Sequence, residues 1–148
     1  MMYKDNERSL LGALVERIIP ASETHGVPGA GDETILTDIL GVAAPHHGAI
    51  CGALALLEEL AKEAGGTSFM DLSDSDQTAA AEAFRAAQPE LAGLIAALTA
   101  QCCYRDDRVM RALDMETRPP FPKGFEVAGG DWALLDPVRT REAFFRKV

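Results

Sequence analysis

Apolar side chains recur at three- and four-residue steps along most of this chain, and that spacing constrains its fold more than any other feature. Residues at these steps share one face of an α-helix, which can then pack against a core. Pro20 ends the first such stripe, because proline has no backbone N–H with which to continue a helix. The pattern therefore predicts an all-α protein. The first stripe comprises Leu10, Leu11, Leu14, Val15, Ile18 and Ile19, with Asp5 or Asn6 expected as its cap.

Caps and helix breakers divide much of the remaining chain into further helices. Capping side chains and prolines stand where helices are expected to start, and glycines stand where one is expected to end. We expect a compact bundle of about five to seven helices, forming a single domain over residues 1–148. The residues that mark these boundaries are Asp32, Pro45, Gly65, Gly66, Ser73 and Pro89, with Asp106 and Asp107 before a last short stripe at 109–113.

Residues 114–136 follow neither a helical nor a strand period and contain three prolines and three glycines. Irregular segments of this length are usually functional or disordered. Apolar residues such as Phe121, Phe125 and Trp132 favour an ordered loop that lies on a surface of this protein or of a partner. Asp136 and Pro137 then predict a terminal helix over residues 137–147.

Charge excludes some classes of partner. The chain carries 14 Lys and Arg against 23 Asp and Glu, a net charge of -9, so we expect no binding to nucleic acid or anionic lipid through phosphate contacts. The excess acid lies almost entirely in residues 1–104. From residue 104 onwards the chain carries six of its nine aromatic side chains. This composition is typical of recognition surfaces, although aromatic residues that complete a core would give the same count.

The cysteines and the apolar segments bear on location. Three cysteines, with no CxxC and no zinc-like Cys/His spacing, predict neither a disulfide scaffold nor a metal site. No stretch approaches the roughly 18 continuous apolar residues of a membrane-spanning helix, and the first residues do not resemble a signal peptide. We therefore expect a cytoplasmic protein, with export alongside a partner as the alternative.

Several motifs, taken in order, resemble the gluconate 2-dehydrogenase subunit 3 family, the small partner subunits of flavin-dependent glucose-methanol-choline oxidoreductases. The ordered set is more specific than any one motif, and it covers most of the chain. The motifs are Leu14–Ala21 with Pro28-Gly29-Ala30 behind it, Tyr104–Leu113, the proline-rich run Arg118–Glu126, and Trp132.

The resemblance implies an all-helical accessory subunit that binds a large flavoprotein subunit and helps it to mature or to be exported. FAD would then belong to the partner, and no cofactor is expected in this chain. Family members commonly begin with a twin-arginine export signal, whereas no Arg-Arg pair precedes an apolar stretch here. We interpret the chain as a divergent member. The expected docking residues are Tyr104, Arg108, Arg111, Phe121, Phe125 and Trp132.

The run Arg105, Arg108 and Arg111 has two interpretations. Such residues at three-residue steps usually form a solvated helix edge with exposed ion pairs. The same edge is also suited to pairing with acidic groups of a partner or with a substrate carboxylate.

A second hypothesis is a freestanding, cofactor-independent lyase that self-associates and takes a small-molecule substrate. His46 and His47 lie near the expected start of a helix, whose dipole favours neutral imidazole as a base. With Tyr104 and Arg105 they would cleave a hydroxylated small molecule, with aromatic molecules among the candidates, and release a small aldehyde. Adjacent helical positions point about 100° apart, so the two histidines do not chelate one metal together. His47 shares its face with Cys51; the simpler alternative is that one histidine caps the helix and the other is solvated.

Overall fold

A computed structural model describes residues 3–119, 121–126 and 129–142. In these residues the chain forms seven α-helices and three short 3-10 helices, and no strand. The prediction of an all-α fold is confirmed. Internal contacts divide the chain into two units, Met1–Thr117 and Arg118–Val148, and each is described by itself.

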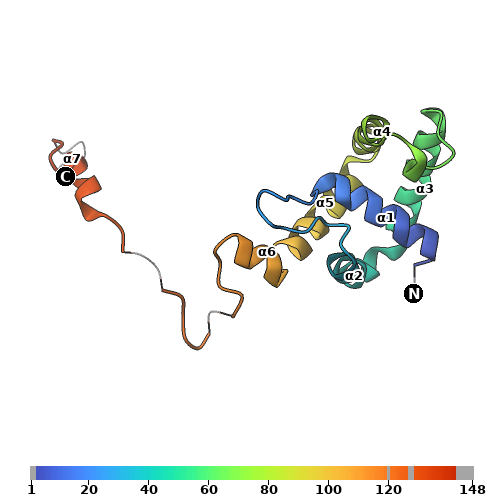
Figure 1. Ribbon diagram of the computed structural model, residues 1–148. Helices are drawn as coiled ribbons and strands as arrows, with labels where there is room; N and C mark the ends of the chain where they lie inside the picture. Colours follow the sequence, from blue (N-terminus) through green and yellow to red (C-terminus); the bar gives the residue numbers. More distant parts are fainter. Residues whose placement is uncertain (1–2, 120, 127–128, 143–148) are drawn as a thin grey trace. The chain divides into compact units, whose positions relative to one another are not determined.

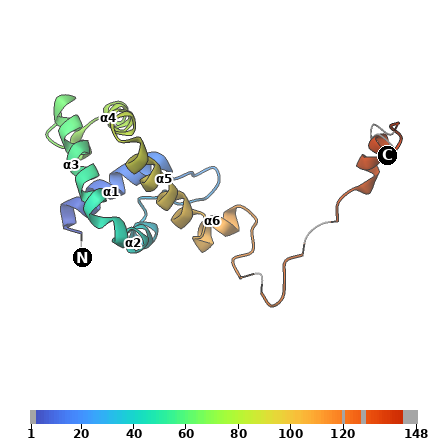
Figure 2. The same ribbon diagram turned by 180° about the vertical axis from the view of Figure 1, so that it is seen from behind.

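The first unit, which we call the body, contains six of the α-helices (Figures 1 and 2). Helix α5 contacts α1, α2, α3 and α4, so it is the central element, and α6 follows it after a short turn. The bounds are α1 Asp5–Ile18, α2 Glu33–Val42, η1 Ala44–His46, α3 His47–Glu63, η2 Phe69–Asp71, α4 Asp74–Ala87, α5 Pro89–Cys103 and α6 Asp107–Ala112.

Side-chain caps start three of these helices. Asp32 accepts a hydrogen bond from the backbone N–H of Thr34 at the start of α2. Ser73 and Asp106 accept corresponding bonds at the starts of α4 and α6. These side chains satisfy N–H groups that have no partner within the helix. The predicted starts at Asp32 and Ser73 are thus confirmed.

Two predicted starts differ from the structure. Neither Asp5 nor Asn6 caps α1, because the helix begins earlier: the Glu7 carboxylate accepts a hydrogen bond from the backbone N–H of Lys4 at 2.8 Å. Such a bond from the third helical residue back to the cap fixes the first turn. Pro45 does not begin the long helix but lies in the 3-10 turn η1, and α3 starts two residues later at His47.

The core lies between these helices. Its largest fully buried side chains are Phe69, Leu11, Ile35, Ile39, Ile50, Leu54, Leu57 and Val15, with Thr99, Cys102 and Cys103 beside them. The stripe predicted for the first helix supplies four of the buried residues, Leu10, Leu11, Leu14 and Val15. The amphipathic pattern therefore faces the core as expected.

The second unit is shorter, and the apolar side chains of its described residues are exposed. It contains η3, Trp132–Leu135, and α7, Asp136–Arg139. The terminal helix predicted over 137–147 overlaps α7, while residues 140–142 are not helical and residues 143–148 lie outside the described residues. Asp136 is the first residue of α7 and its cap position is taken by Leu135.

Among the described residues, no single helix has the length and apolar composition to cross a membrane. One pair, Glu33–Val42 with Ala44–Glu63, meets that test by length and composition together, with a bend of 62° between its parts.

Candidate functional site

The two adjacent histidines lie in different environments. His46 is exposed at the end of η1. His47 is half-buried at the first position of α3, and its ring packs against the ring of Tyr3, with centroids 4.5 Å apart and planes tilted by 55°. Only His47 therefore belongs to an organised group of side chains.

That group lies where the start of α1 meets the start of α3, and we call it the α1–α3 cluster: Tyr3, Glu7, His47 and Cys51. Cys51 follows His47 by one helical turn, and its Sγ lies 3.7 Å from Nε2 and 3.9 Å from Nδ1 of that imidazole. Each of Glu7, His47 and Cys51 offers one potential metal-ligand atom, and these three atoms lie within 4.8 Å of one another. All three residues are half-buried.

Electrostatics within the cluster follow from these contacts. The backbone N–H of Lys4 lowers the pKa of the Glu7 carboxyl, and Cys51 and His47 act in the same direction. Burial raises the pKa of the Cys51 thiol, and the nearby Glu7 carboxylate raises it further. Burial also raises the pKa of Tyr3. Among the described residues, the Tyr3 hydroxyl is the buried side-chain oxygen or nitrogen that has no hydrogen-bond partner.

The remaining residues of the lyase hypothesis lie elsewhere. Tyr104 is 59% exposed and lines a hollow of about 200 Å³ together with His25 and Leu113. Arg105 lines a different hollow, beside Asp38. Neither hollow includes His46 or His47. The structure thus does not bring the four predicted catalytic residues into one of these cavities.

Arginines on and before α6 pair with carboxylates of the same chain. Arg105 forms a bidentate ion pair with Asp38 of α2. Arg108 donates to Asp32, the cap of α2, at 2.6 Å and to Asp106, while Arg111 pairs with Asp107 within α6. The Arg108 guanidinium lowers the pKa of Asp32. Two arginines of the predicted cationic edge, Arg105 and Arg108, therefore connect the start of α6 to α2 and its cap, whereas Arg111 does not.

The pair of Asp38 and Arg105 also affects Cys102, which lines the same hollow as these two residues. Burial raises the pKa of its thiol to about 11, and the Asp38 carboxylate contributes. A thiol that stays protonated in a core position is inert. We therefore place Cys102 in the core and not in a reactive site.

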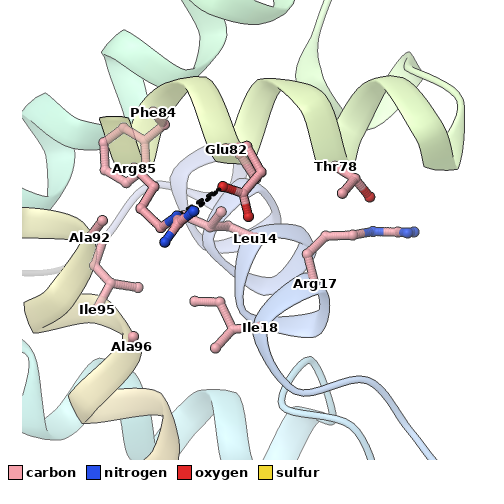
Figure 3. A pocket seen from close by; sticks show the side chains of 11 residues that line it. Leu14, Arg17, Ile18, Thr78, Glu82, Phe84, Arg85, Ala92, Ile95 and Ala96 are labelled. Carbon is pink, nitrogen blue, oxygen red and sulfur yellow. Dashed lines mark hydrogen bonds and ion pairs between the residues drawn. The ribbon is translucent and has the colours of Figure 1, made fainter. Parts of the chain in front are cut away.

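A further pocket of about 250 Å³ opens between α1, α4 and α5 (Figure 3). Its lining is mostly apolar and includes Leu14, Phe84 and Ile95. Two ion pairs lie at it: Arg85 with Glu82 at 2.6 Å, and Arg17, which reaches Asp74 at 2.8 Å. This pocket was not predicted from the sequence, because α1, which forms one of its walls, lies far along the chain from α4 and α5, which form the others.

The expected docking residues of the second unit are exposed. Phe121 is 85% exposed and Trp132 is 70% exposed, and Leu134 and Val138 are also open to solvent. Phe125 lies beneath the Arg118 guanidinium, which is 5.1 Å from the centre of its ring. Apolar surface of this kind is typical of an interaction site.

Comparison of the sequence with models of protein families shows which family this chain belongs to. The model of the family described as gluconate 2-dehydrogenase subunit 3 matches residues 5–129. The chain belongs to that family. The match covers the body from residue 5 and the second unit as far as residue 129, so both Tyr104 and the proline-rich run lie inside it. No curated protein and no solved structure shows a significant match to this member of the family.

Membership of the gluconate 2-dehydrogenase subunit 3 family makes the chain an accessory subunit of a dehydrogenase by class, with the cofactor expected in the partner. Tyr3 and Glu7 were not predicted from the sequence as members of a site. The spacing of His47 and Cys51 was visible in the sequence, but no local signal links either residue to the start of α1.

Proposed function

We propose that this chain is the accessory small subunit of a flavin-dependent dehydrogenase of the glucose-methanol-choline class, and that it binds the large, FAD-carrying subunit through the apolar side chains of its second unit. One observation carries the proposal: residues 121–138 hold exposed Phe121, Trp132, Leu134 and Val138 on short irregular and helical segments. Aromatic anchors of this type contribute most of the binding energy in protein interfaces.

The body offers a second contact. Tyr104 and Leu113 are exposed at the hollow of about 200 Å³, whose lining also includes Ile19, Val27 and Val109. A hollow of that size accepts one side chain of a partner. Arg105 and Arg108 are already paired with Asp38 and Asp32. We therefore assign these two arginines a structural role in this surface.

Co-expression with a large flavoprotein subunit of this class tests the proposal. We expect the two chains to elute together in gel filtration, with flavin absorbance in the shared peak. The yield of soluble, flavin-loaded large subunit should fall when the small subunit is omitted. If the large subunit is equally soluble and active alone, and no shared peak forms, the accessory role is wrong.

A double variant, Phe121→Ala with Trp132→Ala, tests the docking surface. The shared peak should be lost, while the variant itself stays folded because neither side chain belongs to the core. The matched control is Met70→Ala, since Met70 is also a large exposed apolar residue, at 51%, but lies in η2 of the body. Equal binding by the double variant and the control would contradict the assignment.

A further inference from the structure

We propose that Glu7, His47 and Cys51 bind a divalent transition-metal ion of the zinc type. Thiolate sulfur, imidazole nitrogen and carboxylate oxygen are the ligands that Zn²⁺ uses in proteins. Two helices supply them, α1 for Glu7 and α3 for the other two. The sequence predicted no metal site, because His47-x-x-x-Cys51 lacks a third ligand until α1 packs against α3.

Distances in the cluster are close to those that a tetrahedral ion requires. Bonds of about 2.0–2.3 Å to a central ion separate two ligand atoms by roughly 3.6 Å. Cys51 Sγ and His47 Nε2 already lie 3.7 Å apart, one turn apart on the same face of α3. All three ligand atoms are within 4.8 Å of one another, so Glu7 has to move by only about 1 Å to complete the set.

Neighbouring groups leave Glu7 able to bind. Its Oε2 accepts a hydrogen bond of 2.8 Å from the backbone N–H of Lys4, which holds the carboxylate in place. Its Oε1 lies 4.0 Å from the Lys4 ammonium. The Lys4 side chain is 79% exposed and can turn into solvent. Hydrogen bonding of one carboxylate oxygen by a second group is the usual way in which metal ligands are oriented.

The Tyr3 hydroxyl supplies an independent observation. It is buried without a hydrogen-bond partner, and the Tyr3 ring packs against the ring of His47, with centroids 4.5 Å apart. A buried polar atom without a partner costs free energy unless a water or ligand satisfies it. Three protein ligands leave a fourth position open for water, and such a water would give the Tyr3 hydroxyl a hydrogen-bond partner.

Cobalt titration of the full chain, after removal of metal with a chelator, tests the site. Co²⁺ should produce a thiolate-to-cobalt charge-transfer band and visible bands of tetrahedral intensity. Cys51→Ser should abolish the charge-transfer band, and His47→Ala and Glu7→Gln should each weaken binding at least about tenfold. Zn²⁺ should displace Co²⁺ and raise the melting temperature of the wild type, because it ties α1 to α3.

Matched controls separate this site from adventitious binding. His46→Ala removes the exposed neighbouring histidine and should bind Co²⁺ like the wild type. Circular dichroism of each metal-free variant verifies that it is folded, and Glu7→Gln keeps the shape of the side chain if Cys51→Ser is unstable. A cobalt spectrum without a thiolate band, or equal affinity in the His47→Ala and His46→Ala variants, overturns the proposal. Trp132→Ala should leave the titration unchanged, so failure of the metal site and failure of docking are distinguishable.

Discussion

The body and the second unit use the same kinds of side chain in opposite ways. In the body, Phe69 is fully buried and Phe84 nearly so, whereas in the second unit Phe121 and Trp132 are mostly exposed. A buried aromatic side chain stabilises the fold through the apolar area that it removes from water. An exposed one contributes almost nothing to folding and becomes useful when a partner covers it. The difference therefore separates residues that hold the protein together from residues whose apolar surface is available for the docking proposed above.

The largest expected effect tests the folding side of this comparison. Phe69→Ala should lower the free energy of unfolding by about 3–5 kcal/mol, because it removes a fully buried ring and leaves a cavity. Phe121→Ala should change it by less than about 0.5 kcal/mol. Urea denaturation followed by circular dichroism measures both values. Comparable losses in the two variants would mean that Phe121 packs in a core and that the distinction is wrong.

The next effect tests the recognition side. Trp132→Ala should weaken binding to the large flavoprotein subunit by about 2 kcal/mol, or about 30-fold, as expected for an aromatic anchor at the centre of an interface. The midpoint of urea unfolding should not move. Titration calorimetry with the purified large subunit gives the affinity. A variant that keeps its affinity, or that unfolds earlier, would assign Trp132 to the fold.

Much of the body could be predicted from the sequence because the signals there are local. Asp32 and Ser73 cap helices where their spacing to the next apolar stripe indicates, and Pro89 begins α5 as expected. The start of α1 was missed because Glu7 reaches back to Lys4, a bond between two residues that are ordinary surface residues by type. Local sequence patterns therefore predict which face of a helix is buried better than they predict where the helix begins.

The candidate sites depend on contacts between distant segments, and these were predicted only in part. His47 and Cys51 were placed on one face of a helix, but Tyr3 and Glu7 join them only because α1 packs against α3. Nothing in a periodic pattern specifies which helices meet or at what angle. The arginines before and on α6 illustrate the same limit, since the sequence left open whether they pair with this chain or with a partner.

The smallest expected effect concerns the end of the body, where α6 is held to α2. Arg108→Ala should lower the free energy of unfolding by about 1 kcal/mol, because Arg108 bridges Asp32 and Asp106 from two segments. Arg111→Ala is the matched control: Arg111 pairs with Asp107 inside α6, on the exposed surface, and its loss should cost less than about 0.5 kcal/mol. Equal losses in the two variants would show that α6 is not anchored through Arg108.

The pH dependence of the same variant distinguishes an ion pair from simple packing. Arg108 lowers the pKa of Asp32 and of Asp106 in the folded protein. A carboxyl whose folded pKa lies below its unfolded value stabilises the fold above about pH 4 and loses that contribution as the pH falls through the folded pKa. The difference in unfolding free energy between wild type and Arg108→Ala should therefore be constant near neutral pH and shrink below about pH 4. If the difference in unfolding free energy persists in acid, Arg108 acts through the packing of its aliphatic stem. The attachment of α6 to α2 would then not depend on charge.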